Sequence, residues 1–265
     1  MHCAGKIRIT LKISIITAVY NNRSTVAAAL DSVMMQSHPD VEMIVIDGAS
    51  TDGTREVLAR YESRIAVLVS ERDAGIYDAL NKGISRATGD IIGFLHADDL
   101  LADGDALARV AAAMADTSID AVYGDLVYVR KDDPFRVLRT WNAGGFVPEK
   151  LNRGWMPPHP TFYARRSIYE RLGNFDTTFR IAADYDCMLR FLKVGIRVRY
   201  IPHLQVRMRV GGASNRSLAN IVRKSREDFR ALRKNEIGAV VALVCKNFRK
   251  LPQFFCSNEK RVDRE

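Results

Sequence analysis

Hydrophobic residues in the first half of the chain fall into two alternating kinds of segment. Short β-branched runs of strand length occupy residues 13–20, 41–47, 65–69 and 90–95. Between them, apolar residues three or four positions apart predict amphipathic helices that begin near Ser24, Arg55, Ile76 and Asp103. Near-continuous apolar strands that alternate with such helices are typical of a parallel sheet covered by helices on both faces. The pattern therefore predicts an α/β fold with a central, mostly parallel sheet.

The second half follows this alternation less regularly. Strand patterns at 121–129 and 135–140 are followed by a loop-rich segment at 142–160, helical patterns at 167–172 and 184–193, and a strand pattern at 198–210. A basic helix is predicted at 216–235, followed by a short apolar stretch at 237–245. No apolar run approaches the roughly 18 to 20 residues that span a bilayer. The N-terminus lacks the apolar core of a signal peptide.

The composition is that of an ordinary globular protein: of 265 residues, 47% are hydrophobic and 27% are charged. These proportions exclude a disordered chain, a collagen and a coiled coil as the overall design. The four cysteines, Cys3, Cys187, Cys245 and Cys256, are scattered and form no CxxC pair. Neither a zinc site nor a disulfide framework is indicated, so we expect a cytoplasmic protein.

Charge divides the chain into an acidic front and a basic rear. Residues 1–129 hold 11 Lys and Arg against 18 Asp and Glu, whereas residues 130–210 hold 16 against 7 and residues 211–265 hold 13 against 6. Carboxylates in the front half suit a metal ion or a nucleotide, and cations in the rear suit an anionic partner or a membrane surface. An uneven but merely solvated surface explains the asymmetry equally well.

Sequence motifs for the common nucleotide and hydrolase sites are absent. The chain contains no GxxxxGK[ST] or GxGxxG phosphate loop, no GxSxG nucleophile turn and no HExxH zinc motif. What remains is a set of acidic residues at turns. Because ligands of parallel α/β sheets bind beyond the carboxyl ends of the strands, these acids are the candidate functional residues.

The first two acidic turns follow predicted strands. Asp47 begins the turn DGASTDGT, where a carboxylate can accept hydrogen bonds from a nucleoside; taken alone, the turn is better explained by Asp52 capping the next helix. Asp98 and Asp99 follow the run IIGFLHA, and two adjacent carboxylates that repel each other are a reason to expect a bound divalent cation. Mg²⁺ or Mn²⁺ held by one or two carboxylates and diphosphate oxygens suits so few ligands. Capping of the helix near Asp103 is the alternative.

A third acidic turn opens the helical pattern at 184–193. Asp184 and Asp186 are candidates for a general base, or they are first-turn acids that complement the helix dipole. Their spacing alone favours the dipole. Each of the three turns is a weak or moderate signal by itself, and they become informative only as an ordered set.

Five segments carry this combined signal. They are SIITAVYNN (14–22), VIDGASTDGT (45–54), SERDAGIYDALNKGISRATGD (70–90), IGFLHADD (92–99) and FRIAADYDCMLR (179–190). In this order they resemble the inverting family-two glycosyltransferases, most of all bacterial members that build lipopolysaccharide, exopolysaccharide or glycolipid sugars. The resemblance extends from about residue 13 to about residue 214. It implies an α/β fold of the GT-A nucleotide-diphospho-sugar transferase type, with a central mostly parallel sheet flanked by helices.

The same resemblance implies an organisation into two regions. A GT-A catalytic domain would span residues 1–215, with a nucleotide-sugar half at about 13–129 and an acceptor half at about 130–215. A basic helical extension would span residues 216–265. No internal repeat or low-complexity linker separates these parts.

The resemblance also implies a role for each matching residue. Contacts to the nucleotide sugar are implied for Ala18, Tyr20, Asn22, Asp47, Asp73, Asn81, Gly83 and Asp98. Asp98 and Asp99 are implied to hold Mg²⁺ or Mn²⁺, and Asp184 to take the proton of the acceptor hydroxyl. Two positions depart from the family pattern, because His96 stands where the metal motif usually begins with Asp and Ala183 stands where Glu usually precedes the base. These departures leave open which residues ligate the metal and what supports the base.

Two further segments are implied to lie beside the site. Gly212 and Ser214 lie in the segment GGAS, which resembles the flexible loop that closes over the diphosphate in this family. His159, in the segment PPHP, would line the acceptor or metal side, although a loop histidine held by backbone partners is the more frequent explanation.

Together these roles imply an inverting glycosyltransferase that moves a sugar from a nucleotide-diphosphate sugar to a hydroxyl of a glycan or lipid-linked acceptor, in cell-surface polysaccharide or glycolipid synthesis. The apolar, aromatic and basic residues at 237–255 suit peripheral binding to the anionic inner face of the cell membrane. A helix that packs on the catalytic domain or supports a homodimer suits them equally. A nucleotidyltransferase acting on sugar phosphates is the alternative enzyme, and a basic nucleic-acid-binding protein is the alternative from another class. Because no nucleic-acid-binding motif accompanies the charge, we expect no nucleic acid partner.

Overall fold

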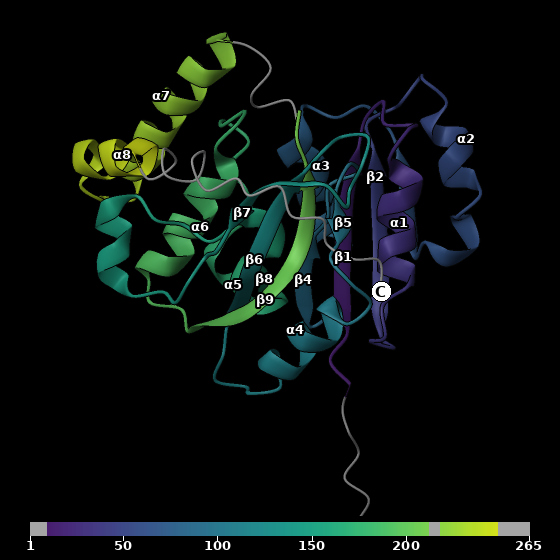
Figure 1. Ribbon diagram of the computed structural model, residues 1–265, viewed down its shortest axis with the longest axis horizontal. Helices are drawn as coiled ribbons and strands as arrows, with labels where there is room; N and C mark the ends of the chain where they lie inside the picture. Colours follow the sequence, from purple (N-terminus) through teal and green to yellow (C-terminus); the bar gives the residue numbers. More distant parts are fainter. Residues whose placement is uncertain (1–9, 212–217, 249–265) are drawn as a thin grey trace, which may run out of the picture.

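The computed structural model of the protein describes residues 10–211 and 218–248, which form an α/β fold around one sheet (Figure 1). The strands are β1 (Ile13–Val19), β2 (Val41–Asp47), β3 (Val67–Ser70), β4 (Ile91–Phe94), β5 (Leu100–Leu101), β6 (Ala121–Val129), β7 (Val137–Trp141), β8 (Tyr163–Arg165) and β9 (Val198–Arg209). The α-helices are α1 (Val26–Met34), α2 (Thr54–Ala59), α3 (Ile76–Ile84), α4 (Ala106–Met114), α5 (Arg166–Leu172), α6 (Ala183–Lys193), α7 (Leu218–Lys234) and α8 (Ala239–Phe248). Short 3₁₀ helices are η1 (Glu62–Arg64), η2 (Pro148–Arg153) and η3 (His159–Thr161).

The first four strands form a parallel half-sheet, as the hydrophobic pattern predicts. Their order is β3-β2-β1-β4, and each neighbouring pair is parallel. Side chains of β1 alternate between the two faces, so that Ile15 belongs to one buried cluster and Ile16 to the other. Because helices cover both faces, nearly every position of β1, β2 and β4 is buried. Burial on both faces explains why these strands have continuous rather than alternating apolar sequences.

The second half of the sheet is mixed, and it contains two strands that the sequence pattern did not predict. β8 pairs antiparallel with both β4 and β6 and so joins the two halves. β9 runs parallel to β6, while β5 and β7 pair antiparallel with β9 and β6. β5 has two residues and β8 has three, too few for a strand pattern to be visible in the sequence. The longest ladders are the parallel ones, so the expectation of a mostly parallel sheet is confirmed.

The basic extension packs on the rest of the protein through α7 and α8. α7 lies against α6, and α8 lies against α7 and η2, at the end of the molecule opposite α2 (Figure 1). Ala231, Leu232, Ile237 and Ala242 are buried in the same cluster as α3 and α6. Packing on the domain is thus observed for this part of the extension, and membrane binding stays a separate prediction. None of the helices in the described ranges is long and apolar enough to cross a bilayer.

Candidate active site

The carboxyl ends of β1 to β4 meet at one edge of the sheet. Val19, at the end of β1, lies opposite Asp47, which in turn lies opposite Ser70 at the end of β3. On the other side of β1, Ile16 lies opposite Phe94 at the end of β4. The turns that follow these strands therefore emerge side by side, and they carry every acid that the resemblance assigns to the nucleotide sugar.

Asp47 is fully buried and holds two of these turns together. Its carboxylate accepts hydrogen bonds from the backbone amide and the hydroxyl of Ser50 and, at 2.6 Å, from the hydroxyl of Ser70. The two serines thus occupy both carboxylate oxygens. Since the structure gives this side chain an internal role, a direct contact of Asp47 with the donor stays a prediction.

Tyr20 and Asp73 flank the backbone of Gly48, and these three residues form what we call the nucleoside ledge. A Cβ atom at position 48 would lie 2.5 Å from Asp73 Oδ2 and 3.3 Å from the Tyr20 ring, so only glycine fits without a shift. Tyr20 is 66% exposed, and the other oxygen of Asp73 accepts the amide of Gly75 at 2.9 Å. An exposed ring beside a half-buried carboxylate suits a nucleoside, because the ring can stack on a base and the carboxylate can accept ribose hydroxyls.

Ala18 and Asn22 lie on either side of Tyr20 in the chain. Ala18 is half-buried near the end of β1. Asn22 shapes the turn before α1: its carbonyl accepts the amide of Val26, and its own amide donates to Thr54 Oγ1 at 2.8 Å. Asn22 therefore ties the turn after β1 to the start of α2, and its contact with the nucleotide sugar, like that of Ala18, stays a prediction.

Two of the residues that are predicted to contact the nucleotide sugar lie on α3 and make contacts within the protein. Asn81 exchanges two hydrogen bonds with the backbone of Phe175, at 2.9 and 3.0 Å. A Cβ atom at Gly83 would lie 2.3 Å from the Ile16 side chain, so glycine lets α3 pack closely on β1. Both residues hold the scaffold behind the site, and their direct contact with the donor stays a prediction.

His96, Asp98, His159 and Asp184 converge beyond the end of β4. The ring centroids of His96 and His159 lie 5.9 Å apart. Burial lowers the pKa of His96, while the nearby charges of Asp98 and Asp184 act to raise it. Burial also lowers the pKa of His159 to about 4, against the charge of Asp184. Asp98 and Asp184, which are far apart in the sequence, therefore both act on His96, and Asp184 acts on His159 as well.

Asp98 and Asp99 have the chemistry of a divalent cation site. Asp98 is half-buried, and its carboxylate makes no hydrogen bond to another described residue. Asp99 is buried and leaves Oδ2 without a hydrogen-bond partner among the described residues. Free carboxylate oxygens are the ligands that Mg²⁺ and Mn²⁺ prefer, so the residues present fit such an ion. Residues 10–211 and 218–248 contain no group of three His, Cys, Asp or Glu side chains placed to hold a metal, so oxygens of the donor would complete the site.

A buried arginine lies beside these two acids. Asp99 Oδ1 accepts the amide of Arg209 at 3.0 Å, and the Arg209 guanidinium donates to the carbonyl of Asp98 at 2.6 Å. Burial and the charge of Asp98 raise the pKa of Asp99 well above its usual value. Arg209 ends β9 and leads toward the predicted diphosphate loop, whose Gly212 and Ser214 lie outside the described residues. The carboxyl edge of the sheet, which we call the acidic rim, therefore combines these two acids with the positive charge of the Arg209 guanidinium.

Asp184 lies half-buried in the first turn of α6. The Tyr77 hydroxyl lies 3.1 Å from Asp184 Oδ1 and 2.7 Å from the carbonyl oxygen of Ile181. Burial and the charge of Asp184 raise the pKa of Tyr77 well above its usual value, so the hydroxyl stays protonated and can donate. A carboxylate with one such donor, and with no cation paired to it among residues 10–211 and 218–248, is suited to accept a proton.

Asp186 is occupied elsewhere and is not available as a base. It is fully buried, and its carboxylate accepts hydrogen bonds from Lys234 at 3.0 Å, Asn235 at 3.0 Å and Arg190 at 3.3 Å. These contacts tie α6 to α7. Of the two candidate bases in this turn, the structure therefore leaves Asp184 facing the site.

His159 is buried against aromatic rings. Its ring stacks on Phe94 at a centroid distance of 5.4 Å and meets Phe175 edge to face at 5.8 Å. Nε2 is buried and has no hydrogen-bond partner within the described ranges. This nitrogen therefore has no backbone partner there, and the implied place of His159 on the acceptor or metal side stays a prediction. The imidazole lies on the side of Asp184 and His96, where the resemblance implies the acceptor or the metal.

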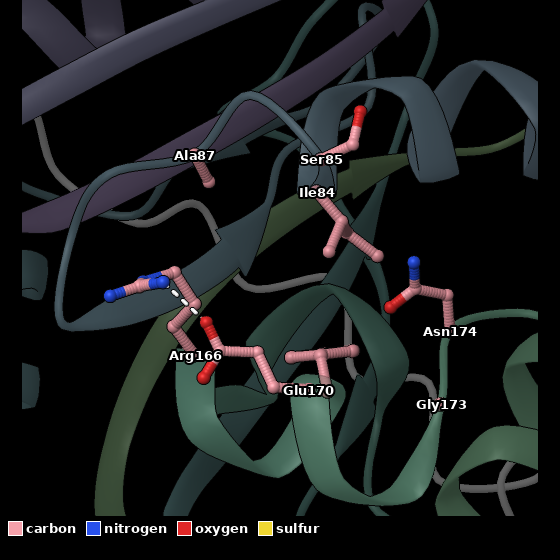
Figure 2. Close-up of a pocket in the computed structure, with 8 residues that line it drawn as sticks. Ile84, Ser85, Ala87, Arg166, Glu170, Gly173 and Asn174 are labelled. Carbon is pink, nitrogen blue, oxygen red and sulfur yellow. Dashed lines mark hydrogen bonds and ion pairs between the residues drawn. The ribbon is translucent and has the colours of Figure 1, made fainter.

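A cleft of about 390 Å³ lies at the opposite edge of the sheet. Figure 2 shows Ser85, from the end of α3, across from α5, where Arg166 and Glu170 form an ion pair. The amide of Arg166 donates to the carbonyl of Asp90, just before β4. The cleft thus lies at the amino ends of the strands and is separate from the acidic rim.

The sequence analysis did not single out three residues that contact the site or the turn before Asp184: Tyr77, Arg209 and Glu227. Tyr77 lies within one of the five resembling segments, so its position was visible although its role was not. Arg209 is one of several cations in a basic strand, and Glu227 is one acid in a basic helix. No local pattern distinguishes either residue from a solvated charge.

Comparisons with known sequences identify the family to which the chain is similar. Residues 14–184 match the family described as Glycosyl transferase family 2. A PGL/p-HBAD biosynthesis glycosyltransferase of Mycobacterium bovis (strain BCG / Pasteur 1173P2) is 33% identical over 209 residues, which are 76% of this chain and 78% of that protein. The putative teichuronic acid biosynthesis glycosyltransferase TuaG of Bacillus subtilis (strain 168) is 44% identical over 90 residues, which are 33% of this chain and 36% of that protein.

Solved structures share the fold. The mannosyltransferase PcManGT from Pyrobaculum calidifontis, in complex with GDP-Man and Mn²⁺, gives a TM-score of 0.66 at 22% identity, covering 94% of this chain and 74% of that chain. S. aureus TarS 1-349 in complex with UDP-GlcNAc gives a TM-score of 0.66 at 16% identity, covering 92% of this chain and 72% of that chain. The family match decides between the predicted glycosyltransferase and the two alternatives, a nucleotidyltransferase and a nucleic-acid-binding protein. The chain belongs to glycosyl transferase family 2 and is a glycosyltransferase with the GT-A fold.

Proposed function

We propose that the protein transfers a sugar, with inversion, from a nucleotide-diphosphate sugar to a hydroxyl of its acceptor. The observation that carries this proposal is the convergence of Asp98 and Asp184 on the ring of His96 at the carboxyl edge of the sheet. Asp98 has no hydrogen bond to a described residue and suits a metal ion. Asp184 is half-buried at the start of a helix and suits proton acceptance.

The donor lies along the rim between the nucleoside ledge and these acids. Its base and ribose contact Tyr20 and Asp73, and its diphosphate points toward Asp98 and Arg209. The buried guanidinium of Arg209 favours an anionic group there, because it is a fixed positive charge. The solved complexes of PcManGT with GDP-Man and Mn²⁺ and of TarS with UDP-GlcNAc support this class of donor.

The reaction is a displacement at the anomeric carbon. Asp184 accepts the proton of the acceptor hydroxyl while the acceptor oxygen forms its bond to that carbon. The bond to the diphosphate oxygen breaks on the opposite face and the diphosphate keeps the electron pair, so the configuration inverts. Asp98 and Asp99 would hold Mg²⁺ or Mn²⁺, which supplies positive charge for the departing diphosphate when bound. The Tyr77 hydroxyl lies beside the Asp184 carboxylate and shares its one hydrogen between that group and the carbonyl of Ile181.

The acceptor is a hydroxyl of a glycan or of a lipid-linked molecule, and α8 is the part of the protein that meets an anionic membrane. Val240, Val241 and Val244 on α8 are 67%, 63% and 48% exposed, and the neighbouring α7 adds the exposed cations Arg223 and Arg226. Apolar side chains beside cations are typical of a helix in the membrane interface. The relatives named for PGL/p-HBAD and teichuronic acid biosynthesis support an acceptor from cell-surface glycolipid or polysaccharide synthesis.

The substitution Asp184→Asn tests the proposed base. A panel of UDP-, GDP- and dTDP-sugars with Mn²⁺ first identifies the donor by thermal stabilisation. With that donor, we expect kcat to fall about 10²- to 10⁴-fold, since the amide cannot take the proton. The dissociation constant of the donor, measured by isothermal titration calorimetry, should stay within about twofold because the side chain keeps its size. Near-normal turnover of this variant would show that another group is the base.

A further inference from the structure

An acid from the C-terminal extension holds the turn that precedes Asp184. The carboxylate of Glu227, on α7, accepts three backbone hydrogen bonds. They come from the amides of Arg180 at 3.1 Å, Ile181 at 2.8 Å and Ala182 at 3.0 Å. The first amide donates to Oε1 and the other two donate to Oε2. Ala182 is the N-cap of α6 and the other two residues precede it, so none of these amides has a partner within the helix and the carboxylate supplies one.

The other side of the same turn is held by Tyr77 on α3. Its hydroxyl lies 2.7 Å from the carbonyl oxygen of Ile181 and 3.1 Å from Oδ1 of Asp184. The amide of Ile181 thus faces Glu227 while its carbonyl faces Tyr77. The backbone just before Asp184 is therefore fixed by two helices, α3 and α7, that are far apart in the sequence.

Glu227 is itself held on a rigid support. About one turn further along α7, Arg230 donates to the hydroxyl of Thr178 at 2.6 Å, and about two turns further, Lys234 donates to Asp176 at 2.8 Å. Ala231 and Leu232 between them are fully buried. Hydrogen bonds from backbone amides to a carboxylate are about twice as strong as neutral ones, so the grip on the turn is firm.

We infer that Glu227 is a positioning residue that sets the place of Asp184 in the site. The inference rests on the proposed function, in which Asp184 is the base. Ala183 leaves the position before Asp184 without an acid, and Glu227 brings a carboxylate to this turn from another helix. Because proton transfer needs the two heavy atoms within hydrogen-bond reach, a loosened turn slows turnover and leaves donor binding intact.

Hydrogen-exchange mass spectrometry on the full chain, without ligand, tests directly whether Glu227 holds these three backbone amides. Glu227→Ala should accelerate exchange about tenfold or more in peptides covering residues 179–186, since the freed amides open to water. In Glu227→Gln the exchange rate of these peptides should lie between those of the unmodified protein and Glu227→Ala, because the single amide oxygen of Gln retains part of the hydrogen bonding. Glu236→Gln is the matched control: Glu236 also bonds to α6, through Lys193 at its far end, and should leave this segment unchanged. Unchanged exchange in Glu227→Ala, or equal acceleration throughout the sheet, overturns the inference.

Kinetics with the donor found in the sugar-nucleotide panel separate this inference from the proposed function. In Glu227→Ala, kcat should fall about 10- to 100-fold while the donor KM stays within about twofold, the effect expected when a catalytic group is misplaced by roughly 1 Å. Asp184→Asn is measured in parallel. If Asp184→Asn keeps full turnover, the proposed function fails. If Asp184→Asn is inactive while Glu227→Ala keeps its kcat, the inference alone fails.

Discussion

Gly48 and Ala49 are adjacent residues whose backbone shapes the nucleoside ledge. Ala49 has a φ of 62°, in the left-handed region that costs a residue with a Cβ atom about 1 kcal/mol. The side chain of Asp47 bonds to the amide of Ser50 across this residue and so stabilises the strained turn. The burial of Asp47 is therefore explained by the shape of the ledge, whether or not the carboxylate also contacts a donor.

The substitution Gly48→Ala should weaken donor binding selectively. Its Cβ atom would lie 2.5 Å from Asp73 Oδ2, so the carboxylate of Asp73 must move. Losing one hydrogen bond to a charged group costs about 1.5 kcal/mol, which corresponds to a roughly tenfold rise in the donor KM with little change in kcat. Gly145→Ala is a control for the loss of a glycine, because a Cβ atom there would meet no other atom within 4 Å and the backbone of Gly145 has no positive φ. An unchanged KM in Gly48→Ala would show that Asp73 does not contact the donor.

At the scale of elements, the sequence predicted the long periodic segments and missed the short ones. β1, β2 and α6 were predicted because each buries many residues with a regular spacing. β5 and β8 were missed because they are defined by their neighbours in the sheet, not by their own residues. The contacts within the site were difficult to predict for the same reason, because they join residues that are far apart in the chain. Asp98 and Asp184 were paired only through the family resemblance, and Glu227 bonds to a turn more than 40 positions away.

The membrane-facing role proposed for α8 predicts a specific loss of binding. Replacing Val240, Val241 and Val244 together by Ser removes exposed apolar side chains without touching the buried Ala242 of the same helix. Binding to vesicles of phosphatidylglycerol and phosphatidylcholine, measured by sedimentation, should weaken about tenfold or more.

A matched variant replaces Met35, Val147 and Val194 by Ser. These side chains are 72%, 47% and 58% exposed and lie outside the extension, so vesicle binding should remain as in the unmodified protein. Equal binding of the α8 variant and the unmodified protein would refute the membrane role. Removing α8 altogether is a poorer test, because Ala242 of this helix belongs to the core of the molecule.

At the scale of the whole molecule, stability depends on a polar cluster at the edge of the sheet away from the site. Glu42, at the start of β2, accepts hydrogen bonds from Ser14, Thr88 and Lys12. Burial alone would raise the pKa of Glu42, but these donors outweigh it and lower the pKa to about 2. Because the folded pKa lies below the unfolded one, the resulting stability is present at neutral pH and is lost as the pH falls from about 5 toward 2.

Glu42→Gln should expose this contribution. At pH 7 we expect the variant to be less stable by on the order of 2 kcal/mol, measured as the free energy of unfolding in urea. The difference between the two proteins should shrink as the pH is lowered from 5 to 3, since over this range Glu42 of the unmodified protein takes up a proton in the unfolded state but stays ionised in the folded state. A difference that stays constant over this range would contradict the assignment.

The grip of α7 on the turn before Asp184 limits how this enzyme can be recombined with its relatives. A chimera that exchanges residues 130–215 for those of another family member would replace the turn at Arg180, Ile181 and Ala182 but keep Glu227 from the host chain. Such a hybrid combines the turn of one protein with the Glu227 of another, so the three hydrogen bonds between them are no longer matched. A chimera designed to alter acceptor choice should therefore exchange residues 130–235 as one unit, with the boundary between the two sequences placed after Asn235.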